Sequence, residues 1–294
     1  MAQFFWKHVS EERPLAMITV LSTSGSTYSK AGSQMLVNNS GDFHGMLSGG
    51  CLEGDLAERS KKVIEEGVSE VFTYNLFGDD EIFGLGVGCE GSMNILMQPL
   101  NSENNYQPFR KLLDTLESSS EAKALTNNMS LQFDSICIKA PIRILILGAG
   151  LDADPLVSIA SLLGWDVSVS DHRPSFIERM KKNVDVNAIC MPCQRISTEL
   201  NLSRFNAAVV MSHNLEADRS YLSALSKSSI KFIGLLGPLH RRERILKDLK
   251  FEAQALDGRL RGPVGKKIGG RGPAAIALEI AAELQSYFHK SKHN

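Results

Sequence analysis

Two cysteines lie in glycine-rich segments of the first ninety residues, where they could act as thiols. Cys51 follows Gly49 and Gly50 and precedes Glu53, between a run that predicts a strand and one that predicts a helix. A thiol at the N-terminus of a helix becomes more reactive, because the helix dipole stabilises the thiolate. The spacing therefore predicts a reactive cysteine at this position.

The second cysteine, Cys89, follows glycines at alternate positions that include Gly86 and Gly88. Glycine weakens a fold by adding backbone freedom, so such a density indicates that the backbone must approach something closely. We expect Cys51 and Cys89 to carry the chemistry of one site. The alternative is that these glycines only form tight turns and that both cysteines pack as small apolar residues.

A third segment upstream offers hydroxyl groups and one cation. Ser24, Ser26 and Thr27 are followed by Lys30 within a short glycine-containing stretch. Hydroxyls, free backbone N–H groups and an ammonium suit a phosphate or a polar heterocycle. Three such segments in one small domain favour a binding site over three unrelated turns.

A different motif begins the second half of the chain. An apolar strand runs into Gly148 and Gly150, with Ala153 completing the G-x-G-x-x-G/A pattern of dinucleotide-binding proteins. Asp171 follows Gly150 by 21 positions, where a carboxylate can accept hydrogen bonds from ribose hydroxyls. The pattern favours NAD or another nucleotide.

Other polar residues complicate that interpretation. Asp152 and Asp154 would repel a pyrophosphate, or they could themselves occupy the positive end of the helix dipole, or act as plain helix caps. His213 follows a later strand and could either face the same crevice or bond to the backbone. The motif therefore predicts a Rossmann-like fold, but it does not by itself predict an enzyme that transfers hydride.

The remaining cysteines indicate no disulfide framework, because five cysteines are an odd number in a chain large enough to be stabilised by burial. Cys190 and Cys193 have C-x-x-C spacing, which can ligate zinc or support thiol chemistry. They form a solitary pair, so we expect two structural cysteines.

Hydrophobic patterning divides the chain into two α/β domains. Residues 1–130 predict a small α+β domain and its linker, and residues 131–294 predict a Rossmann-like parallel-sheet domain with a long C-terminal helix at 272–289. Strands are expected at 16–22, 34–38, 43–47, 70–76, 92–98, 143–147, 166–170, 207–211 and 231–236, and helices at 53–66, 109–117 and 154–163.

Composition excludes several classes of partner. The formal net charge is −1, which gives no electrostatic reason to expect nucleic acid or anionic lipid. The first residues become charged too early for a secretory signal, and no apolar run is long enough to span a membrane. We expect a cytoplasmic protein.

Several motifs together resemble a known family. They are GSTYSKAGSQMLV, LSGGCLEGDLAE, FGLGVGCEGSMNILMQP, ILGAGLDADPL, VVMSHNLEADRSYL, FIGLLGPLHRRERIL and RGPVGKKIGGRGPAAIALEIAAEL. In this order they are similar to the XdhC/CoxI family, the xanthine dehydrogenase accessory factors. The resemblance implies an N-terminal XdhC/CoxI domain and a C-terminal Rossmann domain.

The family resemblance also implies a function. Members are associated with binding the molybdenum cofactor (molybdopterin) and delivering it, in sulfurated form, to a molybdenum hydroxylase of xanthine dehydrogenase type. It implies that Cys51 and Cys89 contact the molybdenum centre or its sulfur, that Glu53 and Asp55 orient the first loop, and that the protein is a homodimer. A cysteine desulfurase is a further expected partner.

The chain departs from the family pattern at three places. Glu90 stands where relatives commonly have glycine, Tyr28-Ser29-Lys30 replaces Pro-Arg-Lys, and residues 265–270 replace a GLDIGA-like stretch. Two other functions therefore remain open. One is an NAD(P)-dependent oxidoreductase with His213 as an acid–base group, and the other is a nucleotide-sensing adaptor without its own chemistry.

Overall fold

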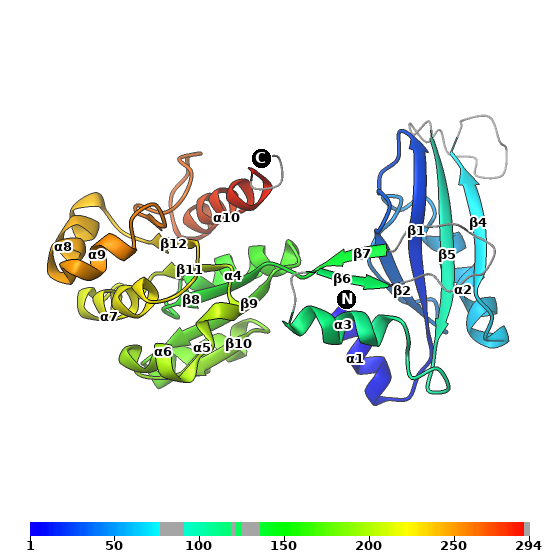
Figure 1. The fold of residues 1–294 in the computed structure, drawn as a ribbon, viewed down its shortest axis with the longest axis horizontal. Coiled ribbons are helices and arrows are strands. Elements are labelled where there is room, and N and C mark those ends of the chain that lie inside the picture. The colour runs from blue at the N-terminus through cyan, green and yellow to red at the C-terminus, as the bar shows by residue number, and fades with distance from the viewer. Residues whose placement is uncertain (77–90, 119–120, 125–135, 291–294) are drawn as a thin grey trace. The chain divides into compact units, whose positions relative to one another are not determined.

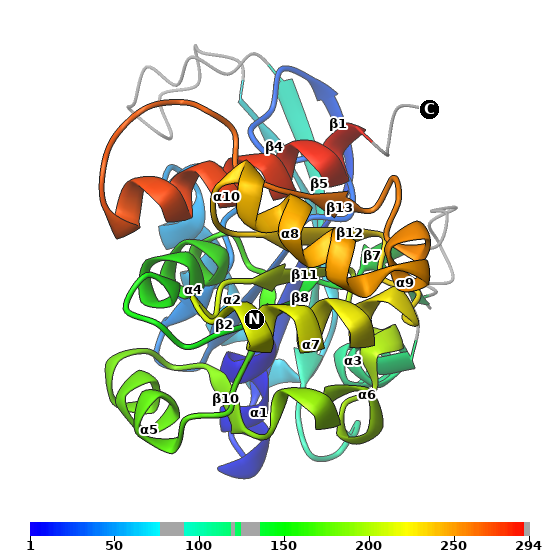
Figure 2. The same ribbon diagram turned by 90° about the vertical axis from the view of Figure 1, so that its left-hand side faces the viewer.

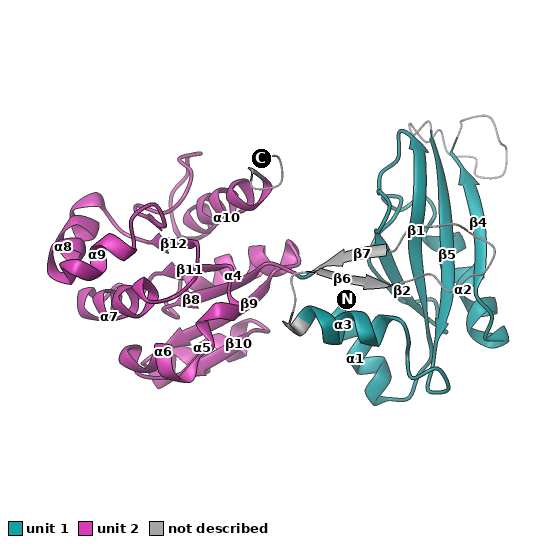
Figure 3. Cartoon of the chain, in the orientation of Figure 1, with its two compact units in different colours: residues 1–140 teal, residues 141–294 magenta. Residues whose placement is uncertain are grey.

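A computed structural model describes residues 1–76, 91–118, 121–124 and 136–290. Its contacts divide the chain into two compact units, residues 1–140 and residues 141–294 (Figure 3). The division follows Ala140, later than the boundary near residue 130 that the sequence predicts, and only the first strand of a small two-stranded sheet lies in the predicted linker. Each unit is described by itself below.

Unit 1 is built on an antiparallel sheet with the strand order β3-β2-β1-β5-β4 (Figure 1). Its strands are β1 (Leu15–Gly25), β2 (Gln34–Asn38), β3 (Phe43–His44), β4 (Glu70–Asn75) and β5 (Gly91–Leu100). Its helices are α1 (Ala2–Ser10), α2 (Glu53–Glu66) and α3 (Phe109–Ser118). Strands β6 (Glu121–Ala124) and β7 (Ile136–Lys139) form the small separate sheet.

The two faces of this sheet have separate apolar cores, because alternate residues of a strand point to opposite faces. Ile18 and Val20 of β1 face α2, whereas Leu15 and Met17 face α1 and α3. The sheet is therefore covered on both sides. Helix α2 has the bounds that the sequence predicts, and it places the Cys51 segment at its N-terminus.

Unit 2 contains a parallel sheet with the strand order β10-β9-β8-β11-β12-β13. Its strands are β8 (Arg143–Leu147), β9 (Asp166–Asp171), β10 (Asn187–Cys190), β11 (Ala207–Val210), β12 (Phe232–Leu235) and β13 (Leu260–Arg261). Its helices are α4 (Ala153–Leu162), α5 (Pro174–Asn183), α6 (Ile196–Glu199), α7 (Leu215–Ser226), α8 (Leu239–Leu249), α9 (Phe251–Ala255) and α10 (Pro273–Lys290), with 3-10 turns at Cys193–Arg195 and Leu202–Arg204.

This order is that of a Rossmann fold, in which the first strand, β8, lies in the middle and the order of the strands reverses between β8 and β11. Helices α4, α5 and α10 contribute to the core on one face, and α6, α7 and α8 to the core on the other. Figure 2 shows α4 and α5 on one side of the strands and α6 and α7 on the other. The predicted Rossmann-like parallel-sheet domain is confirmed.

In the part of the chain that the structure describes, no helix is long and apolar enough to cross a membrane.

Candidate functional site

The loop before α2 is held from inside by one carboxylate. Glu53 is buried, and its Oε1 accepts hydrogen bonds from the N–H groups of Leu47 and Ser48, both at 2.8 Å. Its Oε2 accepts from the Gly50 N–H at 2.9 Å and from the Ser48 hydroxyl. The Ser48 hydroxyl in turn accepts from the Leu52 N–H at 2.7 Å. One side chain thus fixes the whole backbone turn.

These hydrogen bonds determine the charge state of Glu53. Burial by itself raises the pKa of this carboxyl, but the hydrogen bonds from Ser48 and Leu47 outweigh burial and hold the pKa below its ordinary value. Glu53 is therefore an anion that faces its own loop. The family resemblance implies that Glu53 orients the first loop, and these hydrogen bonds are those of a group in that position.

Cys51 lies on the outward side of this turn. It is a free, partly exposed cysteine two residues before the start of α2. Asp55, by contrast, bonds away from the loop, accepting from Arg59 Nε at 2.7 Å and from the Tyr74 hydroxyl. The loop therefore presents a thiol to solvent and keeps its carboxylates inside or bonded to their neighbours.

The hydroxyl-rich turn after β1 contacts the Cys51 loop. Ser29 is buried and donates from its hydroxyl to the Met46 carbonyl at 3.4 Å. The Tyr28 ring packs on Gly49, since a Cβ added there would lie 3.4 Å from two ring atoms. Two segments about twenty residues apart in the sequence are therefore neighbours in space.

The same turn is braced internally. Thr27 is buried and its hydroxyl donates to the Ser29 carbonyl at 2.8 Å. Lys30 reaches the Thr27 hydroxyl with its Nζ at 3.5 Å, and its side chain is exposed. Ser24 and Ser26 are exposed as well. The turn thus offers hydroxyls and one ammonium beside the Cys51 loop.

A third segment adjoins the turn. Gly91 pairs with Gly25 at the end of β1, and a Cβ at Gly91 would lie within 3 Å of the carbonyl oxygens of Ser24 and Ser26. Glycine is therefore required for this close approach. Gly91 is two residues after Cys89, but Cys89, Gly86 and Gly88 lie outside the described residues.

The glycines of the Rossmann turn in unit 2 are explained by contacts within the protein. A Cβ at Gly148 would lie 2.5 Å from the Met211 carbonyl oxygen, because the turn crosses directly beside the end of β11. A Cβ at Gly150 would lie 2.4 Å from an oxygen of Asp152. Both glycines make room for the protein's own atoms, so their presence alone does not indicate a pyrophosphate.

Asp171, predicted to accept hydrogen bonds from a ribose, is fully buried. Its Oδ2 accepts from the Ala149 N–H at 2.8 Å and from Arg173 Nη2 at 2.7 Å, and its Oδ1 accepts from the N–H and Nε of Arg173. Burial raises the pKa of Asp171, but these hydrogen bonds outweigh burial and lower it. The carboxylate anchors the glycine turn from within.

A second acidic residue near this turn has a cationic partner. Asp154 accepts from Arg179 at 2.6 and 3.0 Å, and the same guanidinium donates to the carbonyls of Ala149 and Gly150. Arg179, on α5, is a site residue that the sequence analysis misses. Its only sequence signal is a positive residue eight positions after Asp171, which is common on solvated helices.

Asp152 and His213 form a pair across the switch point. His213 Nε2 lies 2.7 Å from Asp152 Oδ2, and the histidine side chain is 61% exposed. His213 has a φ of +59°, a conformation that costs a non-glycine residue about 1–2 kcal/mol. An exposed pair of side chains contributes about 0–1 kcal/mol to stability, so the contact with Asp152 does not fully offset the strain.

The C-x-x-C pair is divided between surface and core. Cys190 is exposed at the end of β10, and Cys193 is buried in the following 3-10 turn, where burial raises the pKa of its thiol. Among the described residues, no group of three or more His, Cys, Asp or Glu side chains could hold a metal ion.

The fold and these loops define a class of protein. It is a two-unit α/β protein. In unit 1 an antiparallel sheet carries a loop with a thiol, and in unit 2 the side chains of Asp171 and Arg179 form hydrogen bonds with the backbone of the Rossmann glycine turn. Residues 8–75 match the family described as XdhC and CoxI, and residues 144–284 match the XdhC Rossmann domain. The chain belongs to the XdhC and CoxI family.

Individual relatives agree with this assignment. The chain is 28% identical to a probable xanthine dehydrogenase subunit of Bacillus subtilis strain 168, with 94% of each chain covered. It is 22% identical to the molybdenum cofactor insertion chaperone PaoD of Escherichia coli K12, over 92% of this chain and 82% of the relative. A crystal structure of a xanthine dehydrogenase from Bacillus halodurans matches with a TM-score of 0.78 at 25% identity, covering 98% of this chain and 95% of the other.

Proposed function

We propose that this protein is an accessory chaperone that binds the molybdenum cofactor and helps deliver it, in sulfurated form, to a molybdenum hydroxylase of xanthine dehydrogenase type. The observation that carries the proposal is the convergence in unit 1 of the turn at residues 24–30, the loop at residues 48–51 and Gly91. The names of relatives, which include a molybdenum cofactor insertion chaperone, support the same function.

The residues present fit such a cargo. A thiolate is a soft ligand suited to a molybdenum centre or its sulfur, and Cys51 is the partly exposed thiol of the loop. Cys89, close to Gly91 in sequence, is the second proposed thiol. The exposed hydroxyls of Ser24 and Ser26 with the ammonium of Lys30 suit the phosphate of the cargo, and Thr27 supports them by bracing the turn.

Glu53, Gly49 and Gly50 have a supporting role in this proposal. The buried carboxylate holds the Gly50 and Ser48 N–H groups, so the loop keeps one conformation before the cargo arrives. Loops that are ordered in advance bind more tightly because less conformational entropy is lost on binding. Glu53 thus acts through the loop and not through contact with the cargo.

Nucleotide binding by unit 2 is the alternative, whether of NAD(P) by an oxidoreductase or of another nucleotide by a sensing adaptor. Gly148, Gly150 and His213 lie at the switch point, where sheets of this order bind their ligands. However, Asp171 is buried and bonded to Arg173, so a dinucleotide would have to bind without its usual ribose partner. This geometry favours the chaperone over the oxidoreductase.

The partners of the proposed function follow from the family resemblance. We propose a homodimer in the cytoplasm that receives sulfur through a cysteine desulfurase and releases cofactor to its hydroxylase. Light scattering on the purified protein tests the dimer, since a monomeric mass would contradict it. Co-purification with added desulfurase tests the second partner.

The decisive experiment for the function combines binding and transfer. Purified protein is expected to bind the molybdenum cofactor stoichiometrically and to activate a cofactor-free hydroxylase of xanthine dehydrogenase type. A Cys51→Ala, Cys89→Ala double variant should lose both properties, whereas Cys190→Ala, which removes an exposed cysteine of unit 2, should keep them. Full binding by the double variant would refute the proposed thiols, and absence of binding by the unaltered protein would refute the function.

A further inference from the structure

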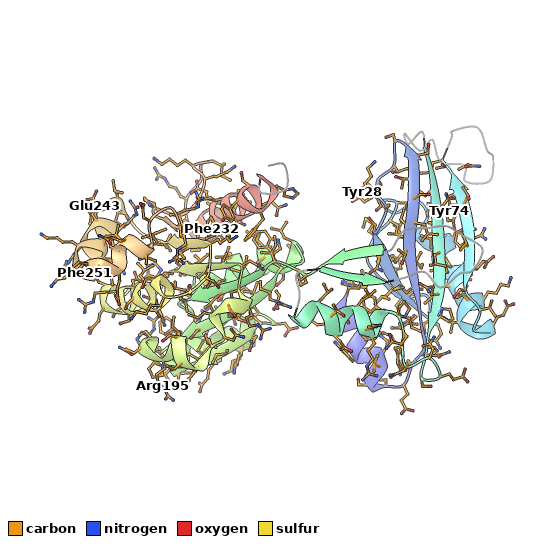
Figure 4. The ribbon with its side chains drawn as sticks, in the orientation of Figure 1. Tyr28, Tyr74, Arg195, Phe232, Glu243 and Phe251 are labelled. Atoms are coloured by element: carbon orange, nitrogen blue, oxygen red, sulfur yellow. The ribbon has the colours of Figure 1, made fainter. Side chains whose placement is uncertain are left out.

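Tyr28 differs from every other tyrosine of the chain in its exposure. Its side chain is 62% exposed, whereas Tyr74, Tyr106 and Tyr221 are buried and Tyr287 is partly buried. Figure 4 shows Tyr28 and Tyr74 on either side of β1 in unit 1. An exposed aromatic ring beside a candidate binding loop is an unusual feature, because aromatic residues normally bury a large apolar area.

The backbone that carries Tyr28 is fixed on both sides. Thr27 and Ser29 are both buried, and the Thr27 hydroxyl donates to the Ser29 carbonyl. The Ser29 hydroxyl donates in turn to the Met46 carbonyl at the start of the Cys51 loop segment. Tyr28 is therefore held outward by two buried neighbours and does not belong to a freely moving stretch.

The ring itself rests on the Cys51 loop. A Cβ at Gly49 would lie 3.4 Å from ring atoms Cδ2 and Cε2, and Gly49 has a φ of +76°. Any larger residue at this position would be strained by its backbone conformation and crowded by the ring. The contact supports the ring from one side and leaves most of its surface open to solvent.

We propose that Tyr28 is a stacking platform for the flat pterin ring system of the cargo, against the loop that carries Cys51. This inference rests on the proposed function and assigns one residue of this chain to the organic part of the cargo. Flat conjugated heterocycles stack on aromatic side chains irrespective of their hydrogen-bonding pattern, because each has a π-face. The thiol and the ring would then recognise the metal end and the pterin end separately.

The test uses the full-length protein and a ligand without the metal. Metal-free molybdopterin is the probe, and isothermal titration calorimetry measures its binding independently of any hydroxylase activity. We expect Tyr28→Ala to weaken this binding about 10-fold, within the factor of about 5 to 150 that stacking on an aromatic side chain accounts for. Tyr28→Phe keeps the ring and should bind within about 2-fold of the unaltered protein.

Phe43→Ala is the matched control. Phe43 is another exposed aromatic residue of unit 1, 45% exposed on β3, and its loss should leave pterin affinity unchanged. Circular dichroism of each variant checks that the fold is intact, which we expect because Tyr28 contributes little buried area.

The outcomes separate this inference from the proposed function. If the unaltered protein binds cofactor but Tyr28→Ala binds the pterin equally well, the platform is refuted and the chaperone function stands. If Tyr28→Phe binds as weakly as Tyr28→Ala, the hydroxyl and not the ring is responsible, which also refutes stacking. If the unaltered protein binds neither cofactor nor pterin, the proposed function itself fails.

Discussion

Two glycine turns in this protein are built alike and differ in what they present outward. The loop at residues 48–51 and the turn at residues 148–150 each precede a helix, and each is anchored by a buried carboxylate, Glu53 in the first and Asp171 in the second. In unit 1 the anchor leaves a thiol and an exposed ring on the surface. In unit 2 the charged side chains beside the turn, Asp154 and Arg179, bond to each other.

The difference teaches that a binding motif has to be judged by which of its groups remain available. Gly148 and Gly150 satisfy the dinucleotide pattern, yet their lack of side chains accommodates Met211 and Asp152. Arg179 donates to the carbonyls of the same turn. A Rossmann fold therefore indicates where a ligand could bind without indicating that one does.

The largest expected effect is on the anchor of unit 2. Asp171→Asn should lower the free energy of unfolding of unit 2 by about 3 kcal/mol, because it leaves the Arg173 guanidinium without its charged partner next to the core. Chemical denaturation monitored by the fluorescence of Trp165, which lies in unit 2, measures the change. Asp248→Asn, at a surface pair with Arg219, is the control and should change stability by less than about 0.5 kcal/mol.

An Asp171→Asn protein as stable as the unaltered one would mean that the carboxylate is reserved for a ligand, as the dinucleotide interpretation requires. That result would reverse the contrast between the two turns.

A somewhat smaller effect is expected for the anchor of unit 1. Glu53→Gln should destabilise unit 1 by about 2 kcal/mol, since an amide group cannot accept all the hydrogen bonds that reach the two carboxylate oxygens. Hydrogen exchange of the Ser48 and Gly50 amides measures loop opening directly. Glu58→Gln, an exposed residue of α2, serves as the control, and equal exchange in both variants would argue against the anchor.

The pH dependence of unit 1 should follow the same carboxylate. Because the pKa of Glu53 is lower in the folded protein than its ordinary value of 4.5, its contribution to stability is present above that value and is lost as the pH falls through the folded pKa. Denaturation midpoints between neutral and acidic pH should therefore fall less steeply in Glu53→Gln. Parallel pH profiles for the two proteins would contradict the proposed charge state.

The smallest effect is expected at the switch point. His213→Gly relieves the positive φ but loses the pair with Asp152 and adds freedom to the unfolded chain, so its stability should stay within about 1 kcal/mol of the unaltered protein. Thermal denaturation checks this. If the free energy of unfolding fell by more than about 2 kcal/mol, the His213–Asp152 pair would be an important stabilising contact of unit 2.

Periodicity was sufficient to predict most of the framework. Helix α2 and strand β8 have the predicted bounds, and the strand–turn–helix pattern correctly indicates a parallel sheet. Helix α1 is not predicted, because its 9 residues give too short a run for a helical period to stand out. Strands β10 and β13 were missed because they are short, and β13 has only two residues.

The candidate site was predicted less completely, because its organisation depends on contacts between distant residues. Residue types identify Cys51 and the hydroxyls of the first turn, but no local pattern tells that the Tyr28 ring rests on Gly49. Likewise, the spacing of Asp171 from Gly150 fits ribose binding, and only its burial and its bonds to Arg173 give it another role. Spacing along the chain identifies a candidate side chain, whereas packing decides whether that side chain is free to contact a ligand.

X-ray absorption at the molybdenum edge of the cofactor-loaded protein tests the central claim most directly. If a protein thiolate contacts the metal, the unaltered protein should show more sulfur neighbours around molybdenum than a cofactor-loaded Cys51→Ala variant, which keeps Cys89 as the second proposed thiol. Cys190→Ala should match the unaltered protein. An identical sulfur shell in Cys51→Ala and the unaltered protein would contradict the claim that the thiol of the Cys51 loop holds the metal of the cargo.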